Sequence, residues 1–255
     1  MVKLSIIIPA YNEEKRIRKT VDAYVKYFKN YSYELIIIPN GCKDNTEKIV
    51  KELSRKYSKI KYKVIKEPIG KGGAIKEGFK IAQGDLIGFV DADNSTKPKD
   101  FKDLAKNIRK YDCIIASRYI KDAIVKPKQK ITRIMASRGF NFLVRLLFGL
   151  KIHDTQCGAK LFKKQAIKRI IAKLDLTRWA FDVDLLLKTK KEGYKIKEFP
   201  TRWEDNSGSK LKIHRAVIEM LLSLTRLRLI NSKLRFIISF YDSLPESIKV
   251  HHKLR

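Results

Sequence analysis

The sequence has few cysteines, and their arrangement excludes two ways of stabilising a fold. Among 255 residues there are three cysteines, Cys42, Cys113 and Cys157, none in a C-x-x-C pair and none with histidine at zinc-site spacing. Dispersed thiols in odd number support neither a disulfide framework nor a structural zinc site. Cysteine usage of this kind is typical of a reducing compartment, so we expect a cytoplasmic protein.

Long apolar runs are also absent. A membrane-spanning helix needs about 18 or more consecutive apolar residues, and the best candidate, 140–152, is interrupted by Arg145 and Lys151. The apolar run at residues 1–9 is too short for a signal peptide and lacks a small-residue cleavage site. We therefore expect neither a membrane span nor an export signal.

Glycine and proline are scarce, with 12 and 7 residues, while 44% of the chain is apolar. This composition excludes collagen-like and disordered chains. A chain of this length can bury a core, so we expect one large domain with at most an appendage.

Acidic residues are under-represented: 27 Asp and Glu stand against 57 Lys and Arg, a formal net charge of +30. Residues 106–173 alone carry eighteen Lys and Arg against three Asp. The excess fits a nucleic acid, an anionic membrane surface or a phosphate-bearing substrate as partner, or a merely solvated basic face. The sequence has no RNP aromatic pattern, zinc finger or evident helix-turn-helix, so nucleic acid is not the expected partner.

The chain alternates between continuous apolar runs and segments of helical periodicity. Continuous apolar strands that are each followed by a helix predict an α/β fold with a mostly parallel sheet covered on both faces. We expect Asn12 to cap the first helix and residues 44–46 to cap the second. The expected strands are 4–9, 34–38, 61–65 and 86–90, and the expected helices are 13–29, one that begins near residue 46, and 72–83.

In such a sheet the ligand lies beyond the carboxyl ends of the strands. The loops expected there are 9–13, 39–44 and 91–93. They contain neither the dinucleotide fingerprint G-x-G-x-x-G nor a P-loop, which disfavours hydride transfer and P-loop chemistry. Residues 70–73 (GKGG) precede a helix and could cradle a phosphate.

Asp91 and Asp93 form a D-x-D triplet directly after an apolar strand. Two such carboxylates can share a Mg²⁺ or Mn²⁺ ion whose remaining positions are filled by phosphate oxygens. The triplet also occurs in ordinary turns. Its position after a buried strand favours the metal, because two ionised side chains there need a compensating charge.

Taken in order, these motifs resemble family 2 glycosyltransferases of the GT-A fold, a Rossmann-like arrangement. The resemblance spans about residues 4 to 212 and implies a catalytic domain at 1–211, with the basic acceptor-binding segment at 106–173. Downstream motifs resemble the branch that glycosylates polyprenyl phosphates, most of all dolichyl-phosphate β-glucosyltransferases and next dolichyl-phosphate mannose synthases. The matching segments are 5–14 (SIIIPAYNEE), 70–74 (GKGGA), 84–85 (GD), 91–93 (DAD), 117–119 (SRY), 154–158 (DTQCG), 179–182 (WAFD) and 208–211 (GSKL).

The resemblance implies a nucleotide-sugar donor and a divalent cofactor, Mg²⁺ or Mn²⁺. The metal would be held by Asp91, Asp93 and Ser95, where the mannose branch has Gln in place of Ser95. The second-strand loop departs from the family, with Pro-Asn at 39–40 where two aspartates are usual. The residues implied to hold the donor nucleotide are Pro9, Tyr11, Glu13, Asn40, Lys71 and Asp91.

The resemblance also places the acceptor phosphate on Arg118, Arg133 and Ser137. A polyprenyl phosphate is mostly a dianion at neutral pH, so its oxygen is already a nucleophile. Such an acceptor requires cations that hold it in line with the sugar, and no general base. For Arg133 the alternative is a charge that merely faces the membrane.

Asp182 has several open interpretations. In many family 2 enzymes that act on sugar hydroxyls, a carboxylate in this region is the base. With a phosphate acceptor we expect Asp182 to orient donor hydroxyls or Lys and Arg partners; a helix N-terminal carboxylate is the simpler alternative. Gln156 and Trp179 are expected in the sugar pocket. The expected catalytic set is Asp91, Asp93, Arg118 and Asp182.

Residues 212–255 are expected to form basic amphipathic helices. The helix 213–230 has one apolar stripe, which lies in the membrane interface or packs on the domain or another subunit. We expect an enzyme that is peripheral on the cytoplasmic face of the membrane, with an anionic lipid surface and a separate membrane subunit as candidate partners. The residues of the stripe are Ile213, Ala216, Val217, Met220, Leu221, Leu224 and Leu227.

The resemblance, taken with these observations, implies an inverting enzyme that moves a hexose, glucose from UDP-glucose, onto dolichyl or another polyprenyl phosphate. The alternatives are a mannose synthase that uses GDP-mannose and a family 2 transferase that acts on a glycan hydroxyl. A basic nucleic-acid-binding protein with a transferase-like fold is the alternative of a different class, which the D-x-D triplet disfavours.

Overall fold

A computed structural model describes residues 3–127, 131–175, 179–204 and 213–243. Among these residues, one sheet has seven strands in the order β3-β2-β1-β4-β7-β5-β8, and β6 and β9 form a second, two-stranded sheet. The strands are β1 (Leu4–Ala10), β2 (Tyr33–Pro39), β3 (Ile60–Tyr62), β4 (Leu86–Phe89), β5 (Cys113–Ser117), β6 (Ile124–Lys126), β7 (Lys160–Lys163), β8 (Ile196–Pro200) and β9 (Arg202–Glu204).

Strand pairing confirms the expected mostly parallel sheet. Strand β1 pairs in parallel with β2 and with β4, β2 pairs in parallel with β3, and β5 pairs in parallel with β8. Strand β7 is the exception, because it runs antiparallel between β4 and β5. The carboxyl ends of β1, β2, β4 and β5 therefore lie at one edge of the sheet, where the loops gather.

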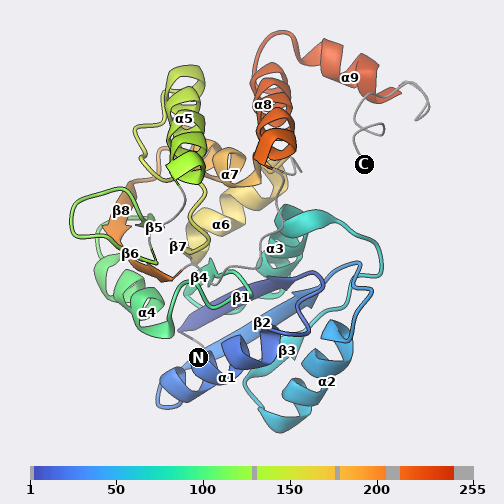
Figure 1. Ribbon diagram of the computed structural model, residues 1–255, viewed down its shortest axis with the longest axis vertical. Helices are drawn as coiled ribbons and strands as arrows, with labels where there is room; N and C mark the ends of the chain where they lie inside the picture. Colours follow the sequence, from blue (N-terminus) through green and yellow to red (C-terminus); the bar gives the residue numbers. More distant parts are fainter. Residues whose placement is uncertain (1–2, 128–130, 176–178, 205–212, 244–255) are drawn as a thin grey trace.

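Helices cover both faces of the large sheet (Figure 1). Along β1, Ile6 and Ile8 belong to a core with α1, α2 and α4, whereas Ile7 belongs to a core with α3, α5, α6, α7 and α8. The alternation of side chains along a strand produces this division. The helices are α1 (Ile17–Phe28), α2 (Thr46–Lys56), α3 (Gly70–Ile81), α4 (Pro98–Asn107), α5 (Ile131–Phe148), α6 (Lys164–Ile170), α7 (Phe181–Lys191), α8 (Ile213–Ile230) and α9 (Arg235–Ser243).

The start of α1 differs from the sequence prediction. The helix begins at Ile17, not at Glu13, and Asn12 does not cap it, because Asn12 has a left-handed backbone (φ 54°) and its side-chain oxygen accepts from the Lys43 backbone N at 2.8 Å. The Glu13 N–H donates to the Thr46 hydroxyl at 2.7 Å. The loop after β1 is thus fixed to the loop after β2, and α1 begins about one turn later than predicted.

Helices α5 and α8 contact each other and project beyond the sheet, and α9 follows α8 (Figure 1). Within the described part of the chain, no helix combines the length and apolarity needed to cross a membrane. The predicted apolar stripe of α8 is divided, since Leu224 and Leu227 are buried but Leu221 is 42% exposed. The side chains of Ile213 and Ala216 lie outside the described set.

Candidate active site

The D-x-D segment follows β4, the strand beside β1 near the middle of the sheet. Its backbone is held by α1: the Thr20 hydroxyl donates to the Ala92 carbonyl at 2.6 Å, and the Tyr24 hydroxyl donates to the Thr96 carbonyl at 2.9 Å. Asn94 adopts a left-handed backbone (φ 58°), which an asparagine tolerates better than most residues. These contacts fix the turn that presents the two carboxylates.

Asp91 is paired with Lys71 from the first turn of α3, with 2.6 Å between Oδ1 and Nζ. Burial raises the pKa of the Asp91 carboxyl, and the neighbouring charges of Asp93 and Asp182 add to this effect despite Lys71. Burial alone would lower the pKa of Lys71, but the attraction of Asp91 and Asp182 raises it above its ordinary value. Asp91, Asp93 and Asp182 therefore all lie close enough to Lys71 to raise its pKa.

Asp93 is oriented by Ser95. The Ser95 backbone N–H donates to Asp93 Oδ1 at 2.9 Å, and the Ser95 hydroxyl donates to the same oxygen. Ser95 is buried, so this double contact fixes the Asp93 carboxylate relative to the chain. The structure thus brings Ser95 to the predicted metal residues as a hydrogen-bond donor to Asp93.

The arrangement suits a hard divalent cation. Carboxylate oxygens are the ligands that Mg²⁺ and Mn²⁺ prefer, and a cation would relieve the crowding of negative charge that raises the Asp91 pKa. Among the residues described, no group of three or more His, Cys, Asp or Glu side chains forms a complete cage. The two aspartates supply part of a coordination sphere and leave positions for phosphate or water oxygens.

Gly158 packs directly against Asp91. A Cβ atom at this position would lie 1.9 Å from Asp91 Oδ2, well inside contact distance. Gly158 is the last residue of the DTQCG motif, so the close approach gives this glycine a physical reason. Sequence reasoning identified the motif but not this role.

The residues implied to hold a nucleotide gather at the same edge. Pro9 lies buried in β1, and Asn40 is buried after β2, where its Nδ2 donates to the Ala10 carbonyl at 3.2 Å. The Tyr11 ring is 52% exposed. The Glu13 carboxylate accepts hydrogen bonds from Arg16 Nε at 2.7 Å and from Arg16 Nη2 at 2.8 Å, yet burial raises the pKa of the Glu13 carboxyl. The site therefore combines an exposed ring with fixed polar groups.

Asp182, in the first turn of α7, is tied to a lysine that the sequence analysis did not single out. Lys160 Nζ lies 2.5 Å from Asp182 Oδ1 and also donates to the Cys157 carbonyl at 2.7 Å. Lys160 is fully buried. Burial opposes ionisation of Asp182, but Lys160 and Lys71 outweigh it and lower the pKa of the carboxyl. A carboxylate held in this way is a weak proton acceptor.

Gln156 and Trp179, the two residues expected in the sugar pocket, lie in contact. Gln156 Nε2 donates to the Trp179 carbonyl at 3.3 Å. The Trp179 indole N–H donates to Glu219 on α8 at 2.7 Å. The loop before α7 is thereby linked to the projecting helix α8.

Arg118 follows β5 and is held by a buried carboxylate. Its Nε and Nη2 donate to Asp154 at 2.8 Å and 2.9 Å, and its backbone N–H donates to the same side chain at 2.9 Å. Burial would lower the pKa of Arg118, but Asp154 raises it. Asp154 binds Nε and Nη2, so this ion pair does not use Nη1. Asp154 is the first residue of the DTQCG motif, and sequence reasoning identified the motif but not this positioning role.

Trp203 of β9 connects Arg118 with Arg133 of α5. The guanidinium carbons of the two arginines lie 5.3 Å and 5.8 Å from the Trp203 ring. Ser137, one turn after Arg133, is half-buried, and its carbonyl accepts from Asn141 at 2.9 Å. The structure therefore brings together the two predicted arginines around a tryptophan that no motif indicated.

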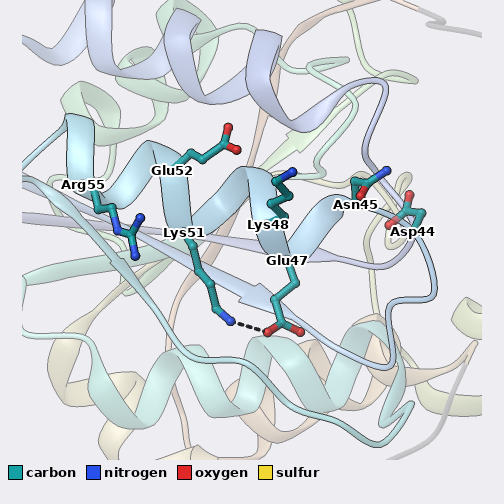
Figure 2. A pocket seen from close by; sticks show the side chains of 7 residues that line it. All are labelled: Asp44, Asn45, Glu47, Lys48, Lys51, Glu52 and Arg55. Atoms are coloured by element: carbon teal, nitrogen blue, oxygen red, sulfur yellow. Dashed lines mark hydrogen bonds and ion pairs between the residues drawn. The ribbon is translucent and has the colours of Figure 1, made fainter.

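A separate cavity of about 440 Å³ lies along the outer surface of α2 (Figure 2). Its walls carry both signs of charge, and Lys51 pairs with Glu47 at 2.7 Å. It contains none of the predicted site residues. Its lining residues are Asp44, Asn45, Glu47, Lys48, Lys51, Glu52 and Arg55.

Comparison with known proteins agrees with this geometry. The profile described as Glycosyl transferase family 2 matches residues 5–171. The chain is 36% identical over 242 residues to the dolichyl-phosphate beta-glucosyltransferase of Dictyostelium discoideum, covering 89% of this chain and 74% of that protein. The human dolichyl-phosphate beta-glucosyltransferase is 34% identical over 227 residues, covering 82% of this chain and 69% of the relative.

Solved structures share the fold at lower identity. The mannosyltransferase PcManGT of Pyrobaculum calidifontis, in complex with GDP-Man and Mn²⁺, has a TM-score of 0.63 and 16% identity, covering 90% of this chain and 64% of that one. Glucosyl-3-phosphoglycerate synthase of Mycobacterium tuberculosis, in complex with UDP, has a TM-score of 0.60 and 15% identity, covering 87% and 80%. The fold is therefore GT-A, and the family profile covers more than half of the chain. The chain belongs to glycosyl transferase family 2.

Proposed function

We propose that this chain transfers glucose from UDP-glucose to dolichyl phosphate or another polyprenyl phosphate, with inversion at the anomeric carbon. The observation that carries the proposal is the meeting, at one sheet edge, of a carboxylate pair after β4 and an arginine pair around Trp203. The first suits a metal-bound diphosphate, and the second suits an anionic acceptor. The relatives named dolichyl-phosphate beta-glucosyltransferase support the choice of sugar and lipid.

On the donor side, Asp91 and Asp93 would hold Mg²⁺ or Mn²⁺, with Ser95 completing the set that we assign to the metal. When bound, the metal neutralises the charge that develops on the departing nucleoside diphosphate. Lys71, 2.6 Å from Asp91, lies where it can contact a diphosphate oxygen. Pro9, Tyr11, Glu13 and Asn40 surround the base and ribose.

On the acceptor side, Arg118 and Arg133 hold the phosphate of the lipid, with Ser137 beside them. Asp154 and Trp203 fix the direction of Arg118, which reduces the ordering needed when the acceptor binds. A guanidinium can contact two phosphate oxygens at once. The attacking oxygen is thereby aimed at the sugar without being protonated.

No side chain needs to act as a general base. The acceptor phosphate, with a second pKa near 6, is already ionised at neutral pH. Lys160 lowers the pKa of Asp182 and occupies its Oδ1. We assign to Asp182 the orientation of donor hydroxyls, next to Gln156 and Trp179.

The lipid is reached from a membrane surface. Helices α5, α8 and α9 expose many large apolar side chains beyond the sheet, and such helices bind in the bilayer interface, assisted by the basic charge of the chain. We propose peripheral attachment at the cytoplasmic face, with a membrane subunit as a further candidate partner. The exposed side chains on these helices are Ile131, Met135, Phe142, Leu146, Leu147, Ile218, Leu221, Leu222, Phe236, Ile237 and Phe240, and Leu234 is exposed just before α9.

The test is transfer of radiolabelled sugar to dolichyl phosphate in detergent, with the product extracted into organic solvent. Labelled UDP-glucose and GDP-mannose are compared in parallel, each with Mg²⁺, Mn²⁺ or EDTA. We expect label in the lipid phase from UDP-glucose, lost with EDTA. Label from GDP-mannose alone would change the assigned donor to GDP-mannose. Label from neither donor, with metal present, would overturn the proposed reaction.

A further inference from the structure

A second cavity lies beside the acceptor arginines, between α5 and the loops that follow β5 and α5. Its volume is about 220 Å³. None of its lining residues belongs to the donor site or to the arginine pair around Trp203. The lining residues are Tyr119, Arg138, Asn141, Arg145 and His153.

The cavity has the charge of an anion site. Arg138 and Arg145 lie two turns apart on one side of α5, and neither forms an ion pair with any carboxylate in the part of the chain that the structure describes. The hydroxyl of Tyr119 is buried and has no hydrogen-bond partner among the described residues. Two unpaired guanidiniums and an unsatisfied phenol match the oxygens of a phosphate.

The nearby carboxylate is already engaged. Glu198 of β8 accepts from His153 Nδ1 at 2.8 Å, from the His153 backbone N–H at 3.0 Å and from the Asp154 backbone N–H at 3.1 Å. It fixes the His153 ring at the edge of the cavity and does not neutralise Arg138 or Arg145. The net charge of the lining is therefore positive.

The apolar surface next to the cavity indicates where the phosphate comes from. Met135, Phe142 and Leu146 are 67%, 57% and 69% exposed. At 100° per residue they form a ridge on α5 directly beside the stripe of Arg138 and Arg145. A basic cavity beside an exposed apolar ridge matches a lipid, with its phosphate in the cavity and its hydrocarbon on the ridge.

The cavity is adjacent to the proposed acceptor site but distinct from it. The Tyr119 ring contacts both arginines, with the guanidinium carbon of Arg118 at 5.2 Å and that of Arg138 at 5.7 Å from the ring centroid. A lipid bound at Arg138 would place the mouth of the acceptor site at the bilayer surface. We infer that this cavity binds the phosphate group of an anionic phospholipid.

The test measures binding of the whole chain to phosphatidylcholine vesicles with and without phosphatidylglycerol. The variant Arg138→Gln/Arg145→Gln should weaken binding to the anionic vesicles about tenfold or more, since each basic residue near the surface contributes about 1 kcal/mol. The matched control Lys48→Gln/Arg55→Gln removes two charges at the same seven-residue spacing from α2. Figure 1 shows α2 and α5 toward opposite ends of the molecule, so the control should bind almost as the wild type does.

A second variant separates a built site from general basic charge. Arg138→Lys/Arg145→Lys keeps both charges but loses the guanidinium fork, so a site predicts weakened binding and a diffuse basic surface predicts none. Equal loss from the α2 control, or unchanged binding of the Lys pair, would overturn the inference. Protection by inorganic phosphate in a thermal shift assay, without any response to anionic vesicles, would show a free phosphate site and also overturn the lipid assignment.

Transfer activity distinguishes this inference from the proposed function. With a short-chain prenyl phosphate in detergent, Arg138→Gln/Arg145→Gln should transfer glucose at the wild-type rate, because the cavity is separate from Arg118 and Arg133. A loss of activity in this assay would assign the cavity to the acceptor site and contradict a separate phospholipid site. Absence of activity in the wild type would overturn the proposed function and leave the vesicle result intact.

Discussion

The two sides of the candidate site carry opposite charge: carboxylates are crowded on the proposed donor side, and guanidiniums gather on the proposed acceptor side. On the donor side, Asp91, Asp93 and Asp182 crowd around Lys71 and Lys160, and burial and mutual repulsion raise the pKa of Asp91. On the acceptor side, the positive charges of Arg118 and Arg133 are placed against aromatic faces and one buried carboxylate.

The difference shows which partner each side can take. Crowded carboxylates at a partly exposed edge gain most from an added cation, whereas guanidiniums that lie against aromatic rings retain their positive charge and so attract an added anion. A substitution that affects one side should therefore change metal and donor parameters, and a substitution on the other side should change acceptor parameters.

The largest expected effect comes from Asp93→Asn, which removes one of the two carboxylates that we propose as metal ligands, without changing the shape of the side chain. We expect kcat to fall about 10³-fold, the upper range for loss of one electrostatic contributor. The measurement is glucose transfer at saturating donor over a range of Mn²⁺ concentrations. Asp85→Asn, at an exposed position before β4, is the control and should retain activity; equal activity of the two variants would contradict the donor-side assignment.

Gly158→Ala tests the packing of Asp91 without removing a charge. Because the new Cβ would meet Asp91 Oδ2 at 1.9 Å, the carboxylate must move, and a displacement of about 1 Å costs about 10²-fold in rate. The measurement is kcat at saturating Mn²⁺. Gly139→Ala has no heavy atom within 4 Å of its Cβ and should be active and slightly more stable. Full activity of Gly158→Ala would show that Asp91 is not held in a catalytic position.

Arg133→Lys tests the acceptor side with the charge retained. A lysine cannot reproduce the bidentate contact or the flat packing on Trp203, so we expect KM for the prenyl phosphate to rise about tenfold while KM for UDP-glucose stays constant. Steady-state kinetics with each substrate varied in turn provides both values. Arg169→Lys on the exposed side of α6 is the control. A change in the donor KM alone would break the division between the two sides.

A further expected effect concerns stability instead of rate and lies outside both sides. Burial raises the pKa of Asp184 in α7 to about 7, whereas an unfolded Asp titrates near 3.9. The folded state then holds a proton that the unfolded state has lost, so stability should fall between about pH 4 and pH 7, by up to about 1.4 kcal/mol per pH unit.

Asp184→Asn should remove this dependence, since the amide oxygen can still accept the Asp175 N–H, a contact of 2.8 Å in the wild type. Urea unfolding at pH 5 and pH 7 measures the difference. If the wild type and the variant show the same change in unfolding free energy between these pH values, Asp184 is ionised throughout and the assignment fails.

Continuous apolar strands and helical periodicity were sufficient to predict the α/β fold and the edge where the loops meet. They could not predict β7 as an antiparallel strand between β4 and β5, because strand order depends on long-range pairing. The Asn12 cap was wrong for a similar reason. Its amide oxygen binds Lys43 of a distant loop instead of the helix that follows.

For the site, sequence motifs located the two aspartates of the D-x-D triplet, but they did not locate the residues that position the site side chains. Asp91 and Asp93 form a local pattern, whereas Lys160 and Trp203 act through contacts with residues far away in the chain. Trp203 in particular lies in no motif, and it is placed near Arg118 by long-range pairing, of β9 with β6, of β8 with β5 and of Trp203 itself with Thr96. Such partners are determined by tertiary packing and leave no spacing signal.

The most direct test of the account is the activity of Asp182→Asn with a polyprenyl phosphate acceptor, compared with Asp93→Asn under the same conditions and with both variants checked for folding by circular dichroism. A general base contributes about 10²- to 10⁴-fold, so its absence from the mechanism can be measured. The account predicts that Asp182→Asn retains substantial turnover, reduced about tenfold, with the pH dependence of the wild type. Loss of activity to the level of Asp93→Asn in a folded variant would make Asp182 the base and contradict a phosphate acceptor that needs none.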